Sequence, residues 1–320
     1  MTPLCAGAAA NAPQRPCPIG DPGICHYTQH YLGSGQRAIG PIRQLPVDLF
    51  MPDAARLEYR NVTMRFAERG GKGTLTAVRG VSFSVADGEV VSLIGPSGCG
   101  KSTLLNIGSG LTAPSEGEAY VDGQRVEGPN AHVAFMLQKD LLLPWRTVAE
   151  NVMFGVEIQG VPLAERRRRA QSLLEKFNLA EFSAHYPHQL SGGMRQRVAL
   201  ARTLAIDPHV LLLDEPFSAV DAQTRIVLQR DLARTLTEAR KTALLITHDL
   251  LEAVTLSDRV LVMSRRPGTI VDEIKIDMPQ RDDPIARRAD PKVNGYVARL
   301  MDRLDIAHAS LEQPPAGAAA

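Results

Sequence analysis

Short apolar runs separated by polar turns dominate the chain after about residue 57. Two runs, Leu57–Phe66 and Thr76–Val85, have strand character, and Asp87-Gly88 then marks a turn. Further strand-like runs lie at Val90–Ile94, near Ala119–Val121, and at Val133–Leu137, Val210–Leu213 and Ala243–Thr247. Continuous Val, Leu and Ile runs are typical of strands buried on both faces of a parallel sheet. The pattern therefore predicts an α/β fold.

Helical periods fill most of the remaining chain. One helix follows a glycine-rich turn and runs to about Leu111, and residues 141–204 are predicted to be mainly helical, including Ala164–Phe177. The run Arg166–Arg169 is interpreted as a solvated helix face, with a phosphate- or lipid-binding patch as the less favoured alternative. The remaining predicted elements are a helix at Gln223–Arg240, a hairpin of Arg259–Met263 with Thr269–Ile276 across Pro267-Gly268, and an amphipathic helix near Asn294–Leu304.

The two ends of the chain lack this order. Residues 1–50 are rich in Pro, Gly and Ala without a sustained period, so we expect them to be mostly disordered. Because Met51 begins the patterned stretch, a further hypothesis is that translation starts there and that residues 1–50 are a spurious extension. A single nucleotide-binding domain is expected over residues 51–285, followed by a helix and flexible tail over 286–320. Four possible metal ligands near the start lack the paired spacing typical of a zinc site: Cys17, Cys25, His26 and His30.

The composition limits the classes of function. The formal net charge of the 320 residues is +1, so no global field attracts nucleic acid. No apolar run approaches the roughly 18 residues of a membrane-spanning helix, and the start lacks the hydrophobic region of a signal peptide. We therefore expect a cytosolic or peripheral protein. The four cysteines do not form a disulfide framework, since three precede residue 26 and Cys99 lies alone.

The glycine-rich turn after Val90–Ile94 reads G-x-x-x-x-G-K-S, the phosphate loop of nucleoside-triphosphate-binding proteins. Its glycines let successive backbone N–H groups face inward at a helix N-terminus, where an anion is favoured. Lys101 adds a positive charge for the β- and γ-phosphates, and the Ser102 hydroxyl can ligate Mg²⁺. ATP and Mg²⁺ are thus the expected ligands. The predicted nucleotide-binding residues here are Gly95, Pro96, Ser97, Gly98, Cys99, Gly100, Lys101, Ser102 and Thr103.

Two carboxylates follow the apolar strand at Val210–Leu213. Asp214 is placed to hold Mg²⁺ through water, and Glu215 can act as the general base that polarises the attacking water. An acidic pair on an ordinary surface is the alternative, but four consecutive apolar residues before the pair argue against it.

A second glycine-containing helix start lies at Leu190-Ser191-Gly192-Gly193-Met194, with Ser191 as N-cap. With it, the sequence resembles the ATP-binding-cassette (ABC) ATPases, whose LSGGQ signature it matches except for Met194. The resemblance implies a P-loop fold with a RecA-like core, an antiparallel β subdomain and an inserted helical subdomain at about residues 141–204. It also implies that Ser191, Gly192 and Gly193 contact ATP held by a second subunit, in a head-to-tail homodimer.

The resemblance implies roles for four further residues. Gln138, at the end of a strand, would be the glutamine that senses Mg²⁺ and the attacking water. His248 would be the switch histidine that bonds the γ-phosphate and orders Glu215. Asp221 would lie near the dimer seam. Phe66 would stack on adenine, with a core phenylalanine as the alternative. The expected catalytic residues are therefore Glu215, His248, Gln138 and Lys101, whereas Phe66 and Asp221 are expected to bind the nucleotide.

Two less universal stretches, Leu141–Val152 and Asp258–Gly268, are similar to the nitrate/sulfonate/taurine-type importers. This resemblance implies a separate membrane permease, a periplasmic or lipid-anchored substrate-binding protein, and a location on the cytoplasmic face of the inner membrane. Trp145 and Arg146 would contact the permease, and a tryptophan buried in the helical subdomain is an equal alternative. The sequence does not specify the transported anion.

Two other functions remain as alternatives. A soluble cassette ATPase acting on nucleic acid or translation usually carries tandem cassettes, zinc modules or long coiled coils, none of which appears here. A non-hydrolysing nucleotide switch is disfavoured by Glu215 and His248. We also expect that a thiol reagent reacts with Cys99 and that bound ATP blocks the reaction.

Overall fold

The computed structural model describes residues 55–67 and 73–309, with side chains as far as Leu304. The predictions for residues 1–50, for the possible ligands Cys17, Cys25, His26 and His30, for a start at Met51 and for the final tail lie outside the described residues. Within the described part, no helix is both long enough and apolar enough to cross a membrane.

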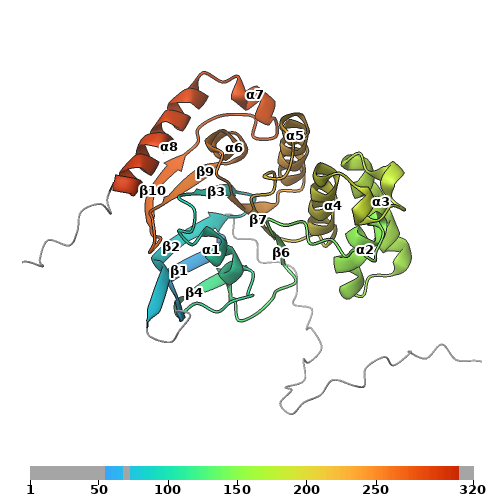
Figure 1. Cartoon of the computed structure of the whole chain (residues 1–320), viewed down its shortest axis with the longest axis horizontal. Coiled ribbons are helices and arrows are strands. Elements are labelled where there is room, and N and C mark those ends of the chain that lie inside the picture. The colour runs from blue at the N-terminus through green and yellow to red at the C-terminus, as the bar shows by residue number, and fades with distance from the viewer. Residues whose placement is uncertain (1–54, 68–72, 310–320) are drawn as a thin grey trace, which may run out of the picture. The chain divides into compact units, whose positions relative to one another are not determined.

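A six-stranded sheet forms the centre of the fold, in the order β10-β9-β3-β8-β7-β6 (Figure 1). Strands β9 to β6 are parallel, and β10 is antiparallel to β9 at the edge. The strands are β3 (Val90–Ile94), β6 (Val133–Met136), β7 (Val210–Asp214), β8 (Thr242–Ile246), β9 (Arg259–Met263) and β10 (Ile270–Lys275). Strands β3, β7 and β8 are buried along their whole length, as their uninterrupted apolar runs predict.

A second, antiparallel sheet has the order β2-β1-β4-β5. Its strands are β1 (Ala55–Ala67), β2 (Thr74–Ala86), β4 (Glu116–Val121) and β5 (Gln124–Arg125). Leu57 lies opposite both Val85 and Val121, and all three join one hydrophobic cluster with Val91 and Leu93 of β3. The cluster therefore joins the two sheets.

Helix α1 (Lys101–Gly108) packs into this cluster through Leu104, whose carbonyl accepts a buried 2.8 Å hydrogen bond from Tyr59. The prediction that the helix reaches Leu111 is wrong. Gly110 has a φ of +76°, and a Cβ there would lie 2.0 Å from the carbonyl oxygen of Gly128. A crossing segment therefore ends the helix, which local periodicity does not reveal.

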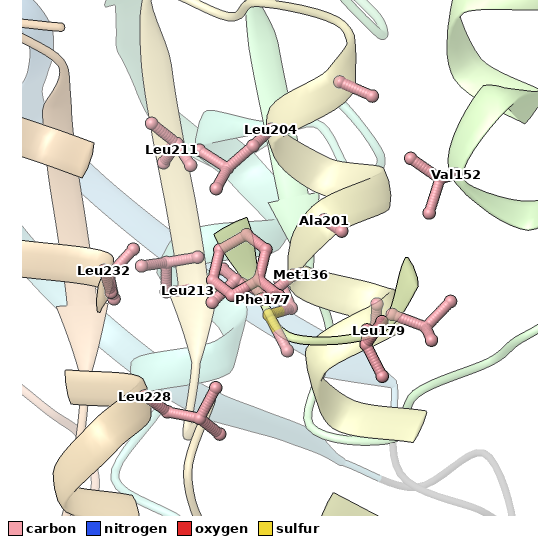
Figure 2. Packing of buried hydrophobic residues seen from close by; sticks show 14 of the residues in the cluster. Met136, Val152, Phe177, Leu179, Ala201, Leu204, Leu211, Leu213, Leu228 and Leu232 are labelled. Atoms are coloured by element: carbon pink, nitrogen blue, oxygen red, sulfur yellow. The ribbon is translucent and has the colours of Figure 1, made fainter. Parts of the chain in front are cut away.

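The predicted helical stretch contains α2 (Val148–Ile158), α3 (Leu163–Lys176), the 3₁₀ turns Ala180–Phe182 and Pro187–Gln189, and α4 (Gly192–Ala205). Its hydrophobic cluster surrounds the fully buried Phe177 and includes Ala201 and Leu204 of α4 (Figure 2). Leu211 and Leu213 of β7 belong to the same cluster, whereas Leu212 faces the cluster shared with the antiparallel sheet. Strand β7 thus joins the two cores.

The C-terminal half adds α5 (Ala222–Glu238), α6 (Leu250–Leu256), α7 (Pro284–Arg288) and α8 (Lys292–Ala309). Sequence reasoning predicted α5 and the middle of α8 but missed α6 and α7. Val293 and Leu300 of α8 are buried in a cluster with Val260, Val262 and Ile274 of β9 and β10. The last helix is therefore anchored on the edge of the sheet (Figure 1).

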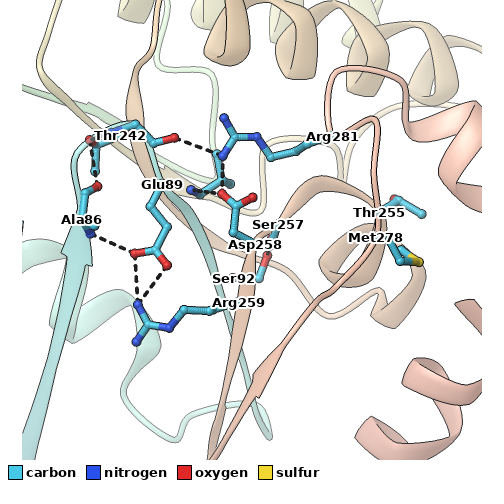
Figure 3. Close-up of polar contacts among 12 residues, drawn as sticks. Ala86, Glu89, Ser92, Thr242, Thr255, Ser257, Asp258, Arg259, Met278 and Arg281 are labelled. Carbon is cyan, nitrogen blue, oxygen red and sulfur yellow. Dashed lines mark hydrogen bonds and ion pairs between the residues drawn. The ribbon is translucent and has the colours of Figure 1, made fainter. Parts of the chain in front are cut away.

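Charged side chains fasten the ends of the central strands to their surroundings (Figure 3). Arg259 donates two 3.0 Å hydrogen bonds to the carboxylate of Glu89, which also accepts a 2.8 Å bond from the backbone N–H of Ala86. Asp258 accepts a 2.9 Å bond from the N–H of Val90 and pairs with Arg281. These contacts link β2, β3 and β9 to the segment before α7.

Arg287 of α7 is only 3% exposed, and burial lowers the pKa of its guanidinium. It donates hydrogen bonds of 2.7, 2.8 and 2.9 Å to the carbonyl oxygens of Met278, Pro279 and Ser257. Arg287→Met leaves these buried acceptors unpaired, so we expect the free energy of unfolding to fall by about 2–4 kcal/mol. Urea denaturation measures this, with the exposed Arg265→Met as control. Equal midpoints for the two variants would contradict it.

Candidate active site

The loop between β3 and α1 follows the backbone geometry that its glycines predict. Gly98 and Gly100 have φ values of +75° and +105°. A Cβ at Gly100 would lie 2.4 Å from a methyl carbon of Val78, so β2 closes directly over the loop. Only glycine fits this conformation and this space. The predicted helix begins at Lys101, and no side chain in the described part of the chain caps the backbone N–H groups of its first turn.

Lys101 lies across the loop and not out in solvent. Its Nζ donates hydrogen bonds of 2.8 and 3.0 Å to the carbonyl oxygens of Gly95 and Pro96. These are neutral acceptors, and a phosphate oxygen would form a stronger, charge-assisted bond to the same ammonium. Lys101 is thus held beside the predicted position of the ATP phosphates.

Asp214 ends β7 and contacts the start of α1. Burial and the neighbouring charge of Glu215 raise the pKa of Asp214, whereas a hydrogen bond from Ser102 and the charge of Lys101 lower it, and burial is the largest cause. A hydroxyl beside a buried carboxylate is a hard oxygen donor set, of the kind Mg²⁺ prefers. Ser102 and Asp214 therefore fit the predicted magnesium ion.

Two predicted catalytic residues, each following a strand end, converge on the carboxylate of a third. Gln138, after β6, donates a 2.9 Å hydrogen bond from Nε2 to Oε2 of Glu215. His248, after β8, places its Nδ1 3.5 Å from the same oxygen. Glu215 has a φ of +48°, which is unusual for a side-chain-bearing residue, and its N–H donates to Ile246. Neighbouring strands thus hold the candidate base where it meets its predicted partners.

A pocket of about 370 Å³ adjoins these groups. Phe66 and Leu75 form an apolar side of it, and both are partly exposed, at 41% and 38%. The core-phenylalanine alternative for Phe66 is therefore wrong, and an open aromatic face is available for a base to stack on. The other lining residues are Ala77, Ser97, Gly98, Gly100, Lys101, Ser102, Thr103, Gln138, Glu215, Ile246 and Arg266.

The signature residues are not among those that line the pocket. Ser191 caps α4, accepting a 3.3 Å hydrogen bond from the N–H of Met194. Asp221 caps α5 in the same way, accepting a 3.0 Å bond from the N–H of Thr224. Gly193 lies against this second cap, since a Cβ there would be 3.6 Å from Thr224. The predicted nucleotide-binding residues therefore form two groups on one chain.

Known proteins have sequences similar to this chain. Residues 78–218 match the family model of the ABC transporters. The taurine import ATP-binding protein TauB of Yersinia pestis is 44% identical over 248 residues, which cover 76% of this chain and 95% of that protein. The aliphatic sulfonates import ATP-binding protein SsuB 1 of Xanthomonas axonopodis is 50% identical over 218 residues, covering 68% and 86%. This chain belongs to the ABC transporter ATP-binding proteins.

Solved structures agree with the ABC fold. A dimeric structure of the cassette MJ0796, described as a bacterial ABC transporter cassette, matches with a TM-score of 0.64. A dimeric, post-hydrolysis state of the same cassette, bound to ADP and Pi, matches with 0.63. Each is 33% identical and covers 69% of this chain and 99% of the other. The predicted P-loop ABC fold is confirmed, and the chain is an ABC ATPase.

Arg266, between β9 and β10, is a pocket residue of this ABC ATPase that sequence reasoning missed. Its guanidinium donates bonds of 3.0 and 2.8 Å to the carbonyl oxygen of Gly98. The adjoining Gly268 touches the loop too, because a Cβ there would lie 2.0 Å from the carbonyl oxygen of Cys99. The sequence predicts a hairpin turn at Pro267-Gly268, but the contact of this turn with the phosphate loop depends on the tertiary fold.

Replacing Arg266 with alanine should loosen the phosphate loop. Loss of its two hydrogen bonds to a single carbonyl, at an exposed position, corresponds to a roughly threefold to tenfold weaker affinity for ATP. Fluorescent-nucleotide titration measures the dissociation constant, and Arg265→Ala is the adjacent control. An unchanged constant in R266A would show that the contact does not organise the loop.

The structure corrects the expectation for Cys99. The residue is 1% exposed, and burial raises the pKa of its thiol. A buried thiol with a raised pKa is a poor nucleophile. Cys99 is therefore a packing residue in the phosphate loop, and the predicted protection of a reactive thiol by ATP does not apply.

Trp145 is 71% exposed, so the alternative of a buried tryptophan is wrong. Arg146 bends back instead, donating a 2.6 Å bond to Glu157 and covering the ring of Phe154 at 4.9 Å. Trp145 and Arg146, which were predicted to act together, therefore differ in their surroundings. The tryptophan is exposed to solvent, whereas the arginine packs against α2.

Proposed function

We propose that this ABC ATPase binds and hydrolyses MgATP as a homodimer and so energises the uptake of a small anion through a separate permease. The convergence of Gln138 and His248 on Glu215, beside the phosphate loop, is the observation that carries the proposal. The import names of similar proteins support the direction of transport, with taurine and aliphatic sulfonates as candidate anions. The family resemblance of the sequence adds nitrate. The proposed place of action is the cytoplasmic face of the membrane.

The chain's own residues divide the work of hydrolysis. The loop amides and Lys101 bind the phosphates, and Phe66 stacks on the base. Ser102, Asp214 and Gln138 would hold Mg²⁺, which neutralises phosphate charge when bound. Glu215 accepts the proton of the attacking water, and His248 keeps the carboxylate and the γ-phosphate in register. Burial around Asp214 excludes bulk water from this side of the site.

The two groups of nucleotide residues support a requirement for a dimer. Ser191, Gly192 and Gly193 would complete the phosphate site of a second subunit, with Asp221 near the seam. ATP is then part of the interface, and its hydrolysis releases the contact. This turns chemistry into a change between two states of the assembly.

Trp145 is the proposed anchor for the permease, because exposed aromatic side chains often dominate protein–protein binding. Trp145→Ala should reduce stimulation of ATP hydrolysis by the permease about tenfold or more, while the affinity for ATP stays within twofold. Purified ATPase titrated with permease in nanodiscs measures both. The control is Ile158→Ala, at another exposed apolar position of the helical subdomain. Undiminished stimulation of W145A would remove the anchor.

A soluble cassette acting on nucleic acid is the rival function. A transport assay separates the two functions. The gene is disrupted while its chromosomal neighbours are left intact, and uptake of labelled taurine, alkanesulfonate and nitrate is measured. Restored uptake of one anion by the wild-type gene, but not by a Glu215→Gln copy, supports the importer. Unchanged uptake of all three, with the ATPase recovered on ribosomes or RNA, would overturn it.

A further inference from the structure

A cluster of metal-binding side chains lies away from the nucleotide pocket. His132 directly precedes β6 and His209 directly precedes β7, whereas Gln138 and Asp214 belong to the opposite ends of these strands. Five strand residues span roughly 16 Å, so the two sites are well separated. Asp122, in the turn between β4 and β5, reaches the two histidines from the antiparallel sheet.

The three side chains aim at one point. Nδ1 of His209 lies 2.7 Å and Nδ1 of His132 lies 2.9 Å from the same carboxylate oxygen, Oδ2 of Asp122. Among the side chains that the structure describes, this is the one group of three or more His, Cys, Asp or Glu residues whose ligand atoms lie within 4.8 Å of one another. Two imidazoles and a carboxylate are a common donor set for zinc.

Small movements would convert this hydrogen-bonded group into a coordination site. Zinc bonds of about 2.0–2.1 Å place tetrahedral neighbours about 3.3 Å apart, so each nitrogen must retreat from the oxygen by about half an ångström. The imidazole proton then moves from Nδ1 to Nε2. The side chains of His132 and His209 are 51% and 45% exposed, so Nε2–H can bond to water, which also supplies the fourth ligand.

Charged side chains around the group orient the ligating carboxylate. Arg56 donates to Oδ1 of Asp122 at 2.8 Å, leaving Oδ2 for the histidines, and its Nε pairs with Asp87 at 2.7 Å. Arg56, Asp87 and Asp122 together carry one net negative charge. Arg240 and Lys241 line the adjoining cavity with His209; Lys241 is paired with Asp207 at 2.7 Å, and the exposed Arg240 offsets the negative charge in part. Arg56 therefore acts as an orienting partner of the ligating carboxylate.

We propose that Asp122, His132 and His209 bind a divalent transition metal of the zinc type. The ion would join the turn of the antiparallel sheet to the starts of two parallel strands. It would act as a structural link between the sheets, separate from the magnesium ion that accompanies ATP.

Metal binding is tested on the full chain, stripped with chelator and free of nucleotide. Zinc stoichiometry is measured by mass spectrometry of metals after equilibrium dialysis, and Co²⁺ is titrated with detection of its visible absorption. His132→Gln removes a half-exposed ligand and is the test variant, and His185→Gln combined with His188→Gln is the control for loss of surface imidazoles. We expect the wild type and the control to bind one zinc more than H132Q.

Thermal unfolding supplies a second readout. At a hundredfold excess of zinc over its dissociation constant, the Tm of the wild type should rise by about 5–10 °C, and that of H132Q by no more than about a third of this. Asp122→Asn should behave like H132Q. Equal zinc stoichiometry and equal Tm shifts in the wild type, H132Q and the control would overturn the proposal and leave the group as a hydrogen-bonded cluster only.

Discussion

Replacing Glu215 with glutamine is expected to reduce the rate of ATP hydrolysis about 10²- to 10⁴-fold, the usual contribution of a general base. The amide keeps the size of the side chain and an oxygen for the 2.9 Å contact from Gln138, but it cannot take a proton from water. It also removes a negative charge beside the γ-phosphate. ATP should therefore remain bound, and the ATP-bound dimer should persist.

Three measurements test this expectation: steady-state phosphate release, equilibrium ATP binding, and size-exclusion chromatography with MgATP. Glu238→Gln is the matched control, because this carboxylate is exposed on α5 and pairs with Lys176 at 3.1 Å. E238Q should hydrolyse ATP at the wild-type rate. If E215Q also did so, another group would have to be the base, and Asp214 is then the neighbour to examine.

Long apolar runs made the central fold predictable. The run before Asp214 is buried at every position, so its place in a parallel sheet could be inferred without tertiary information. Short helices were missed because each depends on its cap and its neighbours. Helix α6 has seven residues, and its N-cap is Asp249, whose carboxylate accepts bonds from the N–H groups of Leu251 and Glu252. Such a segment contains too little periodicity to be recognised.

The candidate site also contains residues that could be predicted from the sequence and residues that could not. Lys101, Gln138, Glu215 and His248 were predictable because each follows a strand at the edge where parallel strands end together. Arg266 was not, because its partner is the backbone carbonyl of Gly98, 168 positions away. The solvent exposure of individual side chains could not be predicted from the sequence either. Cys99 and Trp145 both lie in predicted functional loops, yet one is 1% and the other 71% exposed.

A mixing experiment tests whether the active unit is a head-to-tail dimer. Lys101→Met removes the charge that the phosphate loop supplies, and Gly193→Asp places a negative charge where the partner's ATP would contact the signature helix. Each homodimer carries the same lesion in both sites, so each alone should hydrolyse ATP at no more than about a hundredth of the wild-type rate. These two lesions lie in the two separate groups described above.

In a mixed dimer of K101M and G193D, both lesions fall in one composite site, and the other site is assembled from two intact halves. Random mixing makes about half the dimers mixed, so about a quarter of all sites should be intact. K101M mixed with E215Q is the decisive control. Lys101 and Glu215 border the same pocket, so every mixed dimer keeps one lesion in each site. Activity should return only in the first mixture, whereas no recovery there, or equal recovery in both, would mean that the signature does not complete its partner's site.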